Sequence, residues 1–290
     1  MGIIAIFQYK TTIMSRILFL ITLFFAQFIF AQNFRIYYQY DFKIDSTNLS
    51  NDNKEVMVLD VTDKKSTFIS YQKLIQDSLL YTNSKNYNQN LKPIDLSKSK
   101  INYFVTKNSV NDEVILHDKI GFENYSIKEN EKIYWEILND TKTINNILVQ
   151  KAKTTYLGRN WEAWFSQQYP IQEGPYKFYG LPGLIFELYD DNKQHIFTFA
   201  GLKRNQHNIS SYFKQKEIII SSDKYKKLWL DYKKNPSKFF VSNSMGGGTS
   251  FSMSLDGKSY NESEIIKRIE EQEKQKILKN NNFLDLKLYK

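Results

Sequence analysis

The sequence predicts a mainly β protein with a few helices, an α+β fold built on a curved antiparallel sheet or half-barrel. Apolar and polar residues alternate with a period of two over several long stretches, the pattern of strands with one buried face. These stretches follow one another without helical patterns between them, which favours an antiparallel sheet over parallel βαβ units. Helical patterns appear mainly near the C-terminus.

The composition supports a folded chain and excludes several kinds of site. Aromatic residues make up 16% of the 290 residues, with only 11 glycines and 5 prolines, so the chain is neither disordered nor collagen-like. The absence of cysteine excludes disulfides, thiolate metal sites, a cysteine nucleophile and a lipid-anchoring cysteine. Because there are only 3 histidines, we expect no metal site and no cofactor.

The first 31 residues predict a signal peptide. Residues 1–31 contain no acidic side chain, Arg16 precedes the apolar run Ile17–Phe30, and Ala31 provides a small residue for cleavage. The run is short for a bilayer-spanning helix, which needs about 20 apolar residues. We therefore expect an exported protein, either periplasmic or secreted.

The start and extent of the mature chain follow from the same segment. Met14 is an alternative start to Met1, because the residues after Met14 fit a signal peptide better. No second long apolar stretch follows, so the mature protein is expected not to span a membrane. Residues 32–290 contain no internal repeat and no clean linker, which predicts a single domain with a C-terminal helical extension.

The strands are expected mostly before residue 205. In residues 34–44, aromatic and aliphatic side chains alternate with polar ones, and Asp63–Lys65 separates two further strand patterns as a hairpin turn. A short helix is expected at Tyr71–Leu79, followed by a polar loop over 84–100. Further strands are expected at residues 101–107, 114–122, 132–138, 146–157, 161–167, 184–189 and 194–202.

Two helices are expected near the C-terminus. One follows Ser222, which can serve as its N-cap, and its apolar residues recur at helical spacing. The second covers residues 263–280 and begins at Asn261 or Ser263, with charged residues that can pair along its surface. Between them, Gly246–Gly248 predicts a hinge rather than a phosphate-binding loop, because no Lys-Ser/Thr pair follows.

The formal net charge of +9 is a weak indication of a partner. Nucleic-acid binders usually concentrate lysine and arginine on one face or in a run. Here the basic residues are spread, with small clusters only at Lys224–Lys227 and Lys233–Lys234, so we expect no nucleic-acid partner. Weak attraction to anionic cell-surface polymers stays open.

Residues 159–190 stand apart because the chain path there is tightly prescribed. Three of the five prolines lie between Pro170 and Gly183. Leu181–Leu184 predicts a type II turn, with proline at the second position and Gly183 in the positive-φ third position. The structural motif comprises Gly180, Leu181, Pro182, Gly183, Leu184 and Ile185.

This hexapeptide resembles the signature of the GLPGLI family of exported proteins from Bacteroidetes-type bacteria. The resemblance extends to the signal peptide, Gly158-Arg159, Trp161, Trp164, Pro170-Ile171, Gly174–Phe178, Asp77–Leu79 and Asn282–Leu286. The last of these departs from the family's usual Asn-Pro-Ile-Glu-Leu-like ending. Members of the family largely lack an assigned function, and a similar module precedes the catalytic part of some bacterial peptide-N-glycosidases.

The motif region also holds the best candidates for ligand binding. Aromatic faces stack on sugar rings or apolar ligands, and basic side chains beside them can hold an anionic group. The candidate ligand-binding residues are Arg159, Trp161, Trp164, Tyr176, Lys177 and Tyr179. Core packing is the alternative explanation for the aromatic residues.

Evidence for catalysis is weaker. The three histidines, His117, His195 and His207, lie apart, and neither a His-Glu-x-x-His motif nor a Gly-x-Ser-x-Gly nucleophile elbow is present. Two positioned carboxylates suffice for a glycosidase. Acidic residues that could supply them near the motif are Glu162, Glu173, Glu187, Asp190 and Asp191. We name no catalytic residue.

Three functions fit these observations. The preferred one is an exported, non-catalytic binding or accessory protein directed at a cell-envelope glycan or peptide. The second is a carrier that holds an apolar ligand such as a lipid in a half-barrel cavity, which a filled or polar concave face would contradict. The third is a hydrolase that uses paired carboxylates, or a histidine with a partner, in a cleft.

Overall fold

The computed structural model describes residues 33–85, 95, 99–204, 216–241, 253–255 and 258–290. The expected signal peptide and the Gly246–Gly248 hinge lie outside the described residues, as does most of the expected loop over 84–100.

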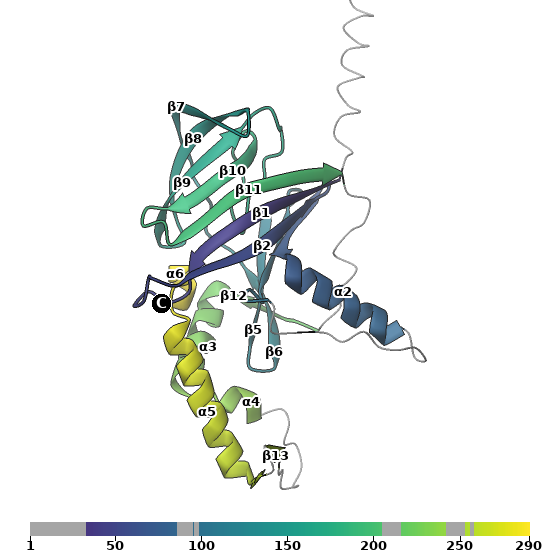
Figure 1. Ribbon diagram of the computed structural model, residues 1–290, viewed down its shortest axis with the longest axis vertical. Coiled ribbons are helices and arrows are strands. Elements are labelled where there is room, and N and C mark those ends of the chain that lie inside the picture. The colour runs from purple at the N-terminus through teal and green to yellow at the C-terminus, as the bar shows by residue number, and fades with distance from the viewer. Residues whose placement is uncertain (1–32, 86–94, 96–98, 205–215, 242–252, 256–257) are drawn as a thin grey trace, which may run out of the picture.

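Twelve strands form one open sheet, which confirms the predicted fold class (Figure 1). The spatial order is β12-β6-β5-β4-β3-β2-β1-β11-β10-β9-β8-β7, and every neighbouring pair is antiparallel except β12 with β6. The strands are β1 (Phe34–Lys43), β2 (Asp52–Val61), β3 (Lys65–Ser70), β4 (Phe104–Asn108), β5 (Glu113–Ile120), β6 (Glu123–Lys128), β7 (Glu136–Ile144), β8 (Ile147–Tyr156), β9 (Arg159–Ser166), β10 (Leu184–Asp190), β11 (His195–Arg204) and β12 (Ile218–Ser221).

Strand β1 joins two runs of consecutive strands. It pairs with β2 on one side and with β11 on the other, so it sits in the middle of the sheet. The alternation of buried and less buried side chains along β1 is as expected, since Tyr38 and Tyr40 are buried while Tyr37 and Gln39 on the other face are half-buried. In Figure 1 the half with β7 to β11 turns away from the half with β4 to β6, which gives the sheet its curvature.

Five helices lie among the described residues: α2 (Tyr71–Lys85), α3 (Ser222–Lys234), α4 (Lys238–Val241), α5 (Glu262–Lys279) and α6 (Leu286–Tyr289). A small hairpin joins β13 (Met253–Leu255) and β14 (Lys258–Tyr260). None of these helices is long and apolar enough to cross a membrane. Helix α2 packs on one face of the sheet, while α3, α5 and α6 lie together near the C-terminus (Figure 1).

The N-terminal caps of the two long C-terminal helices differ from each other. Asn261 caps α5, and its side chain and that of Glu264 form a reciprocal capping box, which confirms one of the two expected starts. The prediction that Ser222 caps α3 is wrong. The N-cap position belongs to Ser221, which makes no side-chain cap, and the Ser222 hydroxyl donates instead to the Lys128 carbonyl at 2.8 Å.

Two expected strands differ in the structure. The strand expected at 132–138 is wrong in position, because β7 begins only at Glu136 and runs to a two-residue turn at Asn145-Asn146, both with positive φ. The strand expected at 114–122 is β5, and it ends in a turn where Gly121 has a φ of 59°. Strand β6 after that turn was not expected.

Aromatic side chains fill the inner face of the curved sheet. The rings of Tyr40 and Phe197 stack with centroids 4.2 Å apart, and Phe178 from the motif region lies 4.8 Å from Trp161. All four residues are at most 2% exposed. The described inner face is therefore occupied by the protein's own aromatic side chains, which counts against an apolar-ligand carrier.

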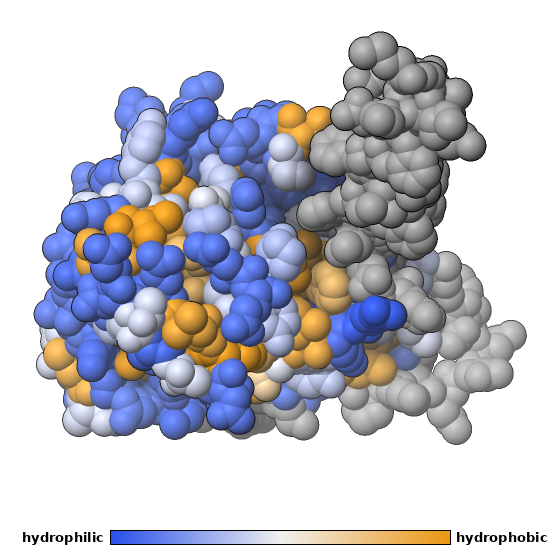
Figure 2. All heavy atoms as spheres, turned by 90° about the horizontal axis from the view of Figure 1, so that it is seen from above, coloured by the Kyte–Doolittle hydropathy of each residue, from blue (hydrophilic) through white to orange (hydrophobic). Residues whose placement is uncertain are grey.

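On the outer surface seen in Figure 2, hydrophobic residues are interspersed with hydrophilic ones.

Candidate functional site

The motif turn is tighter than the sequence predicts. The Gly183 N–H donates to the Leu181 carbonyl at 2.7 Å, which closes a three-residue turn around Pro182. Positive φ occurs at Gly180 and Tyr176 rather than at Gly183, so the type II assignment is wrong. Gly183 is required for space instead, because a Cβ there would lie 2.1 Å from the Ser166 carbonyl oxygen.

Backbone hydrogen bonds hold the motif on the sheet. The Leu184 N–H donates to the Tyr169 carbonyl at 3.0 Å, and the Ile185 N–H to the Glu173 carbonyl at 3.1 Å. From the middle of the sheet, the Tyr38 hydroxyl donates to the Ile185 carbonyl at 2.7 Å. These bonds fix the backbone path of the motif against the inner face of the sheet.

The six candidate ligand-binding residues do not meet at one surface. Strand β9 places Arg159 and Trp161 on the inner face and Trp164 on the outer face, as period two requires. Tyr176 and Lys177 are each 1% exposed, and Tyr179 is half-buried. Packing accounts for the inner residues, and their contact with a ligand stays a prediction.

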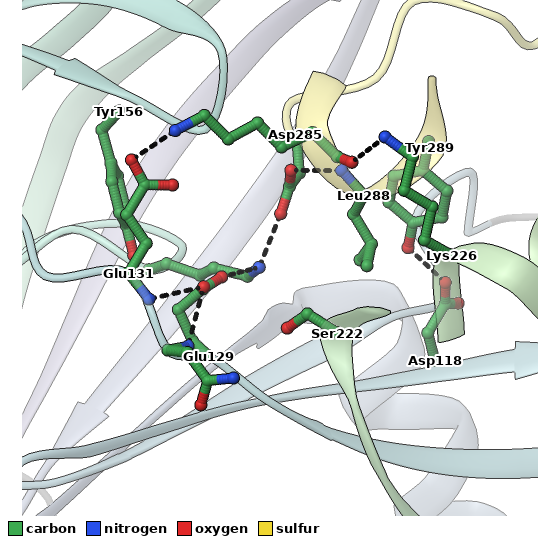
Figure 3. Close-up of polar contacts among 12 residues, drawn as sticks. Asp118, Glu129, Glu131, Tyr156, Ser222, Lys226, Asp285, Leu288 and Tyr289 are labelled. Carbon is green, nitrogen blue, oxygen red and sulfur yellow. Dashed lines mark hydrogen bonds and ion pairs between the residues drawn. The ribbon is translucent and has the colours of Figure 1, made fainter. Parts of the chain in front are cut away.

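Lys177 lies in a buried cluster of charges (Figure 3). Its ammonium contacts Glu129 at 2.7 Å and Asp285 at 2.8 Å, and all three side chains are less than 10% exposed. Burial alone lowers the pKa of Lys177, but the two carboxylates outweigh it and raise that pKa above its ordinary value. Burial also opposes ionisation of Glu129, yet attraction to Lys177 holds the pKa of Glu129 below its ordinary value. The pairing therefore favours the charged forms of Lys177 and Glu129.

Arg159 makes a second buried connection. Its guanidinium contacts the Asp190 carboxylate at 3.0 Å and donates to the Asn282 side chain and the Phe283 carbonyl, each at 2.7 Å. Arg159 and Lys177 therefore bind residues 282–289, which we call the C-terminal segment, rather than an external anion.

The C-terminal segment is itself part of the core. Leu284 and Leu288 are at most 5% exposed, and the Trp229 indole donates to the Tyr289 carbonyl at 3.0 Å. The Tyr289 hydroxyl donates to Asp118, a carboxyl whose pKa burial raises (Figure 3). We call Lys177, Glu129, Asp285, Arg159 and Asp190 the buried junction, because they join the motif to the C-terminal segment.

A second set of charges surrounds Trp164 on the outer face. The Lys142 and Lys151 ammonium groups lie 4.3 and 5.4 Å from the Trp164 ring centroid. The Trp164 indole N–H donates to Glu162 at 3.1 Å, and Glu162 pairs with Lys151 at 2.7 Å. We call this set, completed by Tyr189 and Glu187, the Trp164 cluster. Its ionic side chains are 15–37% exposed, whereas Trp164 itself is only 8% exposed.

Each acidic residue near the motif has its own ion-pair or hydrogen-bond partner within the chain. Glu173 pairs with Lys107, Glu187 with Lys142 and Asp190 with Arg159, while Asp191 accepts from Asn160. Burial opposes ionisation of Glu162, but hydrogen bonds from Lys151 and Tyr189 outweigh it and lower the pKa of Glu162. A glycosidase acid needs a raised pKa instead, so Glu162 does not fit that role.

Two histidines have distinct surroundings. His195 is 1% exposed, hydrogen-bonds the Tyr40 hydroxyl at 2.8 Å, and is held neutral because burial lowers its pKa well below the ordinary value. On the opposite sheet face, His117 contacts the Thr106 hydroxyl at 2.9 Å through Nε2 and Glu217 at 2.8 Å through Nδ1. Separation along the chain hid this second arrangement from sequence reasoning. His207 lies outside the described residues.

Metal binding finds no support in the described ranges, where no three histidine, aspartate or glutamate side chains are grouped to hold an ion.

Comparison with known proteins finds that part of this chain is similar to a family of unknown function. Residues 97–187 match the family model described as "Protein of unknown function (Porph_ging)". The matched stretch contains the Gly180–Ile185 hexapeptide, Arg159 and Lys177. A comparison with curated proteins finds no match.

Two solved structures of PNGF-II, in space groups P21 and C2, are similar to this chain. The first has a TM-score of 0.49 at 16% identity, and the alignment covers 68% of this chain and 33% of the PNGF-II chain. The second has a TM-score of 0.48 at 17% identity and covers 78% of this chain and 35% of its own. The chain thus corresponds to about a third of the length of PNGF-II.

Proposed function

We propose that this chain is an exported, non-catalytic binding or accessory protein that acts as a single domain over residues 32–290. The observation that carries the proposal is the fate of the charged groups near the motif. Each is engaged in an ion pair or hydrogen bond within the chain, and the pKa values of Glu129 and Glu162 are lowered, whereas acid catalysis needs a raised carboxyl pKa.

The Trp164 cluster is the binding surface that we propose for a glycan or peptide. An indole ring with lysines above it and carboxylates beside it can stack on a sugar ring and accept hydrogen bonds from hydroxyl groups. Trp164 is only 8% exposed and the Lys142 ammonium lies over its ring, so the proposal requires Lys142, which is 37% exposed, to move off the ring when a ligand binds. Tyr179, at the rim of the motif region, is a second accessible candidate.

A thermal-shift screen of residues 32–290 against glycans, peptides and lipids tests this proposal. We expect a glycan or peptide to raise the melting temperature, and Trp164→Ala to abolish that shift while the variant still folds. Trp161→Ala is the matched control, because Trp161 lies on the inner face and its loss is expected to lower stability instead. A ligand shift that survives Trp164→Ala would contradict the proposed surface.

A hydrolase is the second candidate, and one observation favours it. Thr106, His117 and Glu217 lie in the order hydroxyl, imidazole and carboxylate, as nucleophile, base and orienting group do in acyl-transfer enzymes. The His117 ring also stacks on Phe104 with centroids 4.1 Å apart, which fixes its orientation.

Hydrolysis of p-nitrophenyl acetate tests this second candidate. We expect turnover above the buffer rate to be lost in both His117→Ala and Thr106→Val if the three residues act together. Turnover that persists in either variant, or none in the unmodified protein, would reject the candidate.

A further inference from the structure

Helix α3 carries an excess of positive charge on its solvent side. Its 13 residues include five lysines and two aspartates. Tyr225, Trp229 and Tyr232 form the buried stripe. At 3.6 residues per turn Lys224, Lys227 and Lys234 fall on the solvent-facing side and are exposed, whereas Lys226 and Lys233 fall on the flank beside the C-terminal segment and are half-buried. The fold therefore gathers the two lysine clusters of the sequence on one helix surface.

None of these five lysines has a carboxylate within ion-pair distance among the described residues. The Lys226 ammonium donates to the Lys287 carbonyl at 2.9 Å (Figure 3), and the Lys233 ammonium to the Tyr289 carbonyl at 3.3 Å. Carbonyl oxygens fix the position of an ammonium group but leave its charge uncompensated. Of the two aspartates, Asp231 is engaged by Lys238 at 2.7 Å.

Lys290, directly after the C-terminal segment, adds to this charge. Burial lowers the pKa of Lys233, and repulsion from Lys226 and Lys290 lowers it further, so both ammonium groups lie within electrostatic range of Lys233. Lys287 is 58% exposed and pairs with Glu131. We call the five α3 lysines together with Lys290 the basic patch.

We propose that the basic patch binds an acidic polysaccharide, whose repeated carboxylate or sulfate groups match several ammonium groups along one helix. A membrane surface fits less well, because interfacial helices insert apolar side chains, whereas the aromatic side chains of α3 are buried in the protein. Single-stranded nucleic acid also fits less well, because it requires exposed aromatic rings for base stacking.

The test is calorimetry, which measures the binding of heparin and of polygalacturonate to residues 32–290 at several salt concentrations. Two double variants remove patch charge: Lys226→Gln/Lys233→Gln, and Lys224→Gln/Lys227→Gln, which touches only exposed side chains. The control is Lys54→Gln/Lys132→Gln, because both side chains are 70% exposed, lie away from α3, and lower the net charge equally. Trp164→Ala reports separately on the Trp164 cluster.

We expect both patch variants to weaken binding about tenfold and the control to leave it nearly unchanged. Added salt should weaken the unmodified protein most, because it has the most charge to screen. Equal losses in patch and control variants would show attraction to overall charge and overturn the proposal. So would the absence of polysaccharide binding, or tighter binding to DNA or to anionic vesicles. Retained binding in Trp164→Ala would separate this site from the proposed glycan surface.

Discussion

The buried junction and the Trp164 cluster are built from the same groups, lysines and carboxylates beside aromatic rings, yet they lie on opposite faces of the sheet. In the junction, Lys177 and its two partners are at most 9% exposed, whereas Lys142 and Glu187 in the cluster are 37% and 23% exposed. The difference in exposure, rather than in chemistry, separates a structural connection from an accessible surface.

The physical reason is the cost of removing water. A buried ion that loses its partner keeps the full desolvation penalty, whereas an exposed ion regains water. Deleting one member of each set therefore measures how far the two regions differ.

The largest effect is expected for Lys177→Met. This change leaves Glu129 and Asp285 as buried, unpaired carboxylates and should lower the free energy of unfolding by about 3–5 kcal/mol. Denaturant unfolding of the variant gives the measurement, with Lys132→Met as an exposed control that should stay within about 0.5 kcal/mol. Equal stability of the two variants would mean that the junction contributes no more than a surface pair.

Gly183→Ala is expected to cost about 2–3 kcal/mol, because its Cβ would meet backbone atoms of Ser166 that cannot move aside. Gly180→Ala should cost about 1 kcal/mol, since there is open space but a φ of 87°. Gly201→Ala has open space and no positive φ, so we expect a small gain in stability. Thermal melts that rank the three differently would contradict the close approach at Ser166.

Acid should weaken the junction by protonating Glu129. Because the folded state lowers the pKa of Glu129, its contribution is complete above its ordinary value of 4.5 and is lost as pH falls through the lowered value. Urea unfolding at pH 7, 4.5 and 3 should show stability falling between the last two. Glu129→Gln should flatten that fall, whereas Glu136→Gln on the exposed strand β7 should not.

The smallest effect is expected for Lys142→Gln in the Trp164 cluster. Its pair with Glu187 is partly exposed, so the free energy of unfolding should change by about 0.5 kcal/mol or less. A loss as large as that of Lys177→Met would remove the distinction between the two regions.

Local patterns predicted most of the sheet. Alternation located β1, β8, β9 and β11 to within a few residues, because one-sided burial imposes period two on the sequence itself. Strands β6 and β12 were missed. Their pairing depends on a turn at Gly121 and on a parallel contact between Ile219 and Ser126, which are distant in sequence.

The candidate site was predicted in part. Sequence reasoning singled out Arg159 and Lys177 as candidate ligand-binding residues, but their partners Asn282 and Asp285 lie more than 100 residues away, so no local signal revealed the contact. The same distance hid Glu217 from His117. The need for Gly183 was recognised for the wrong reason, because close approach of another strand leaves no local pattern.

The central position of β1 has a consequence for the speed of folding. The runs β2 to β6 and β7 to β11 are each made of strands that are consecutive in the chain, so their pairing closes loops far shorter than that between β1 and β11, the longest connecting Ser70 of β3 to Phe104 of β4. By contrast, β1 places Phe34 opposite Arg204, near the far end of the sheet-forming chain. Contacts of such high sequence separation slow folding through the entropy of loop closure. The meeting of β1 and β11 is therefore the step that we expect to set the folding rate.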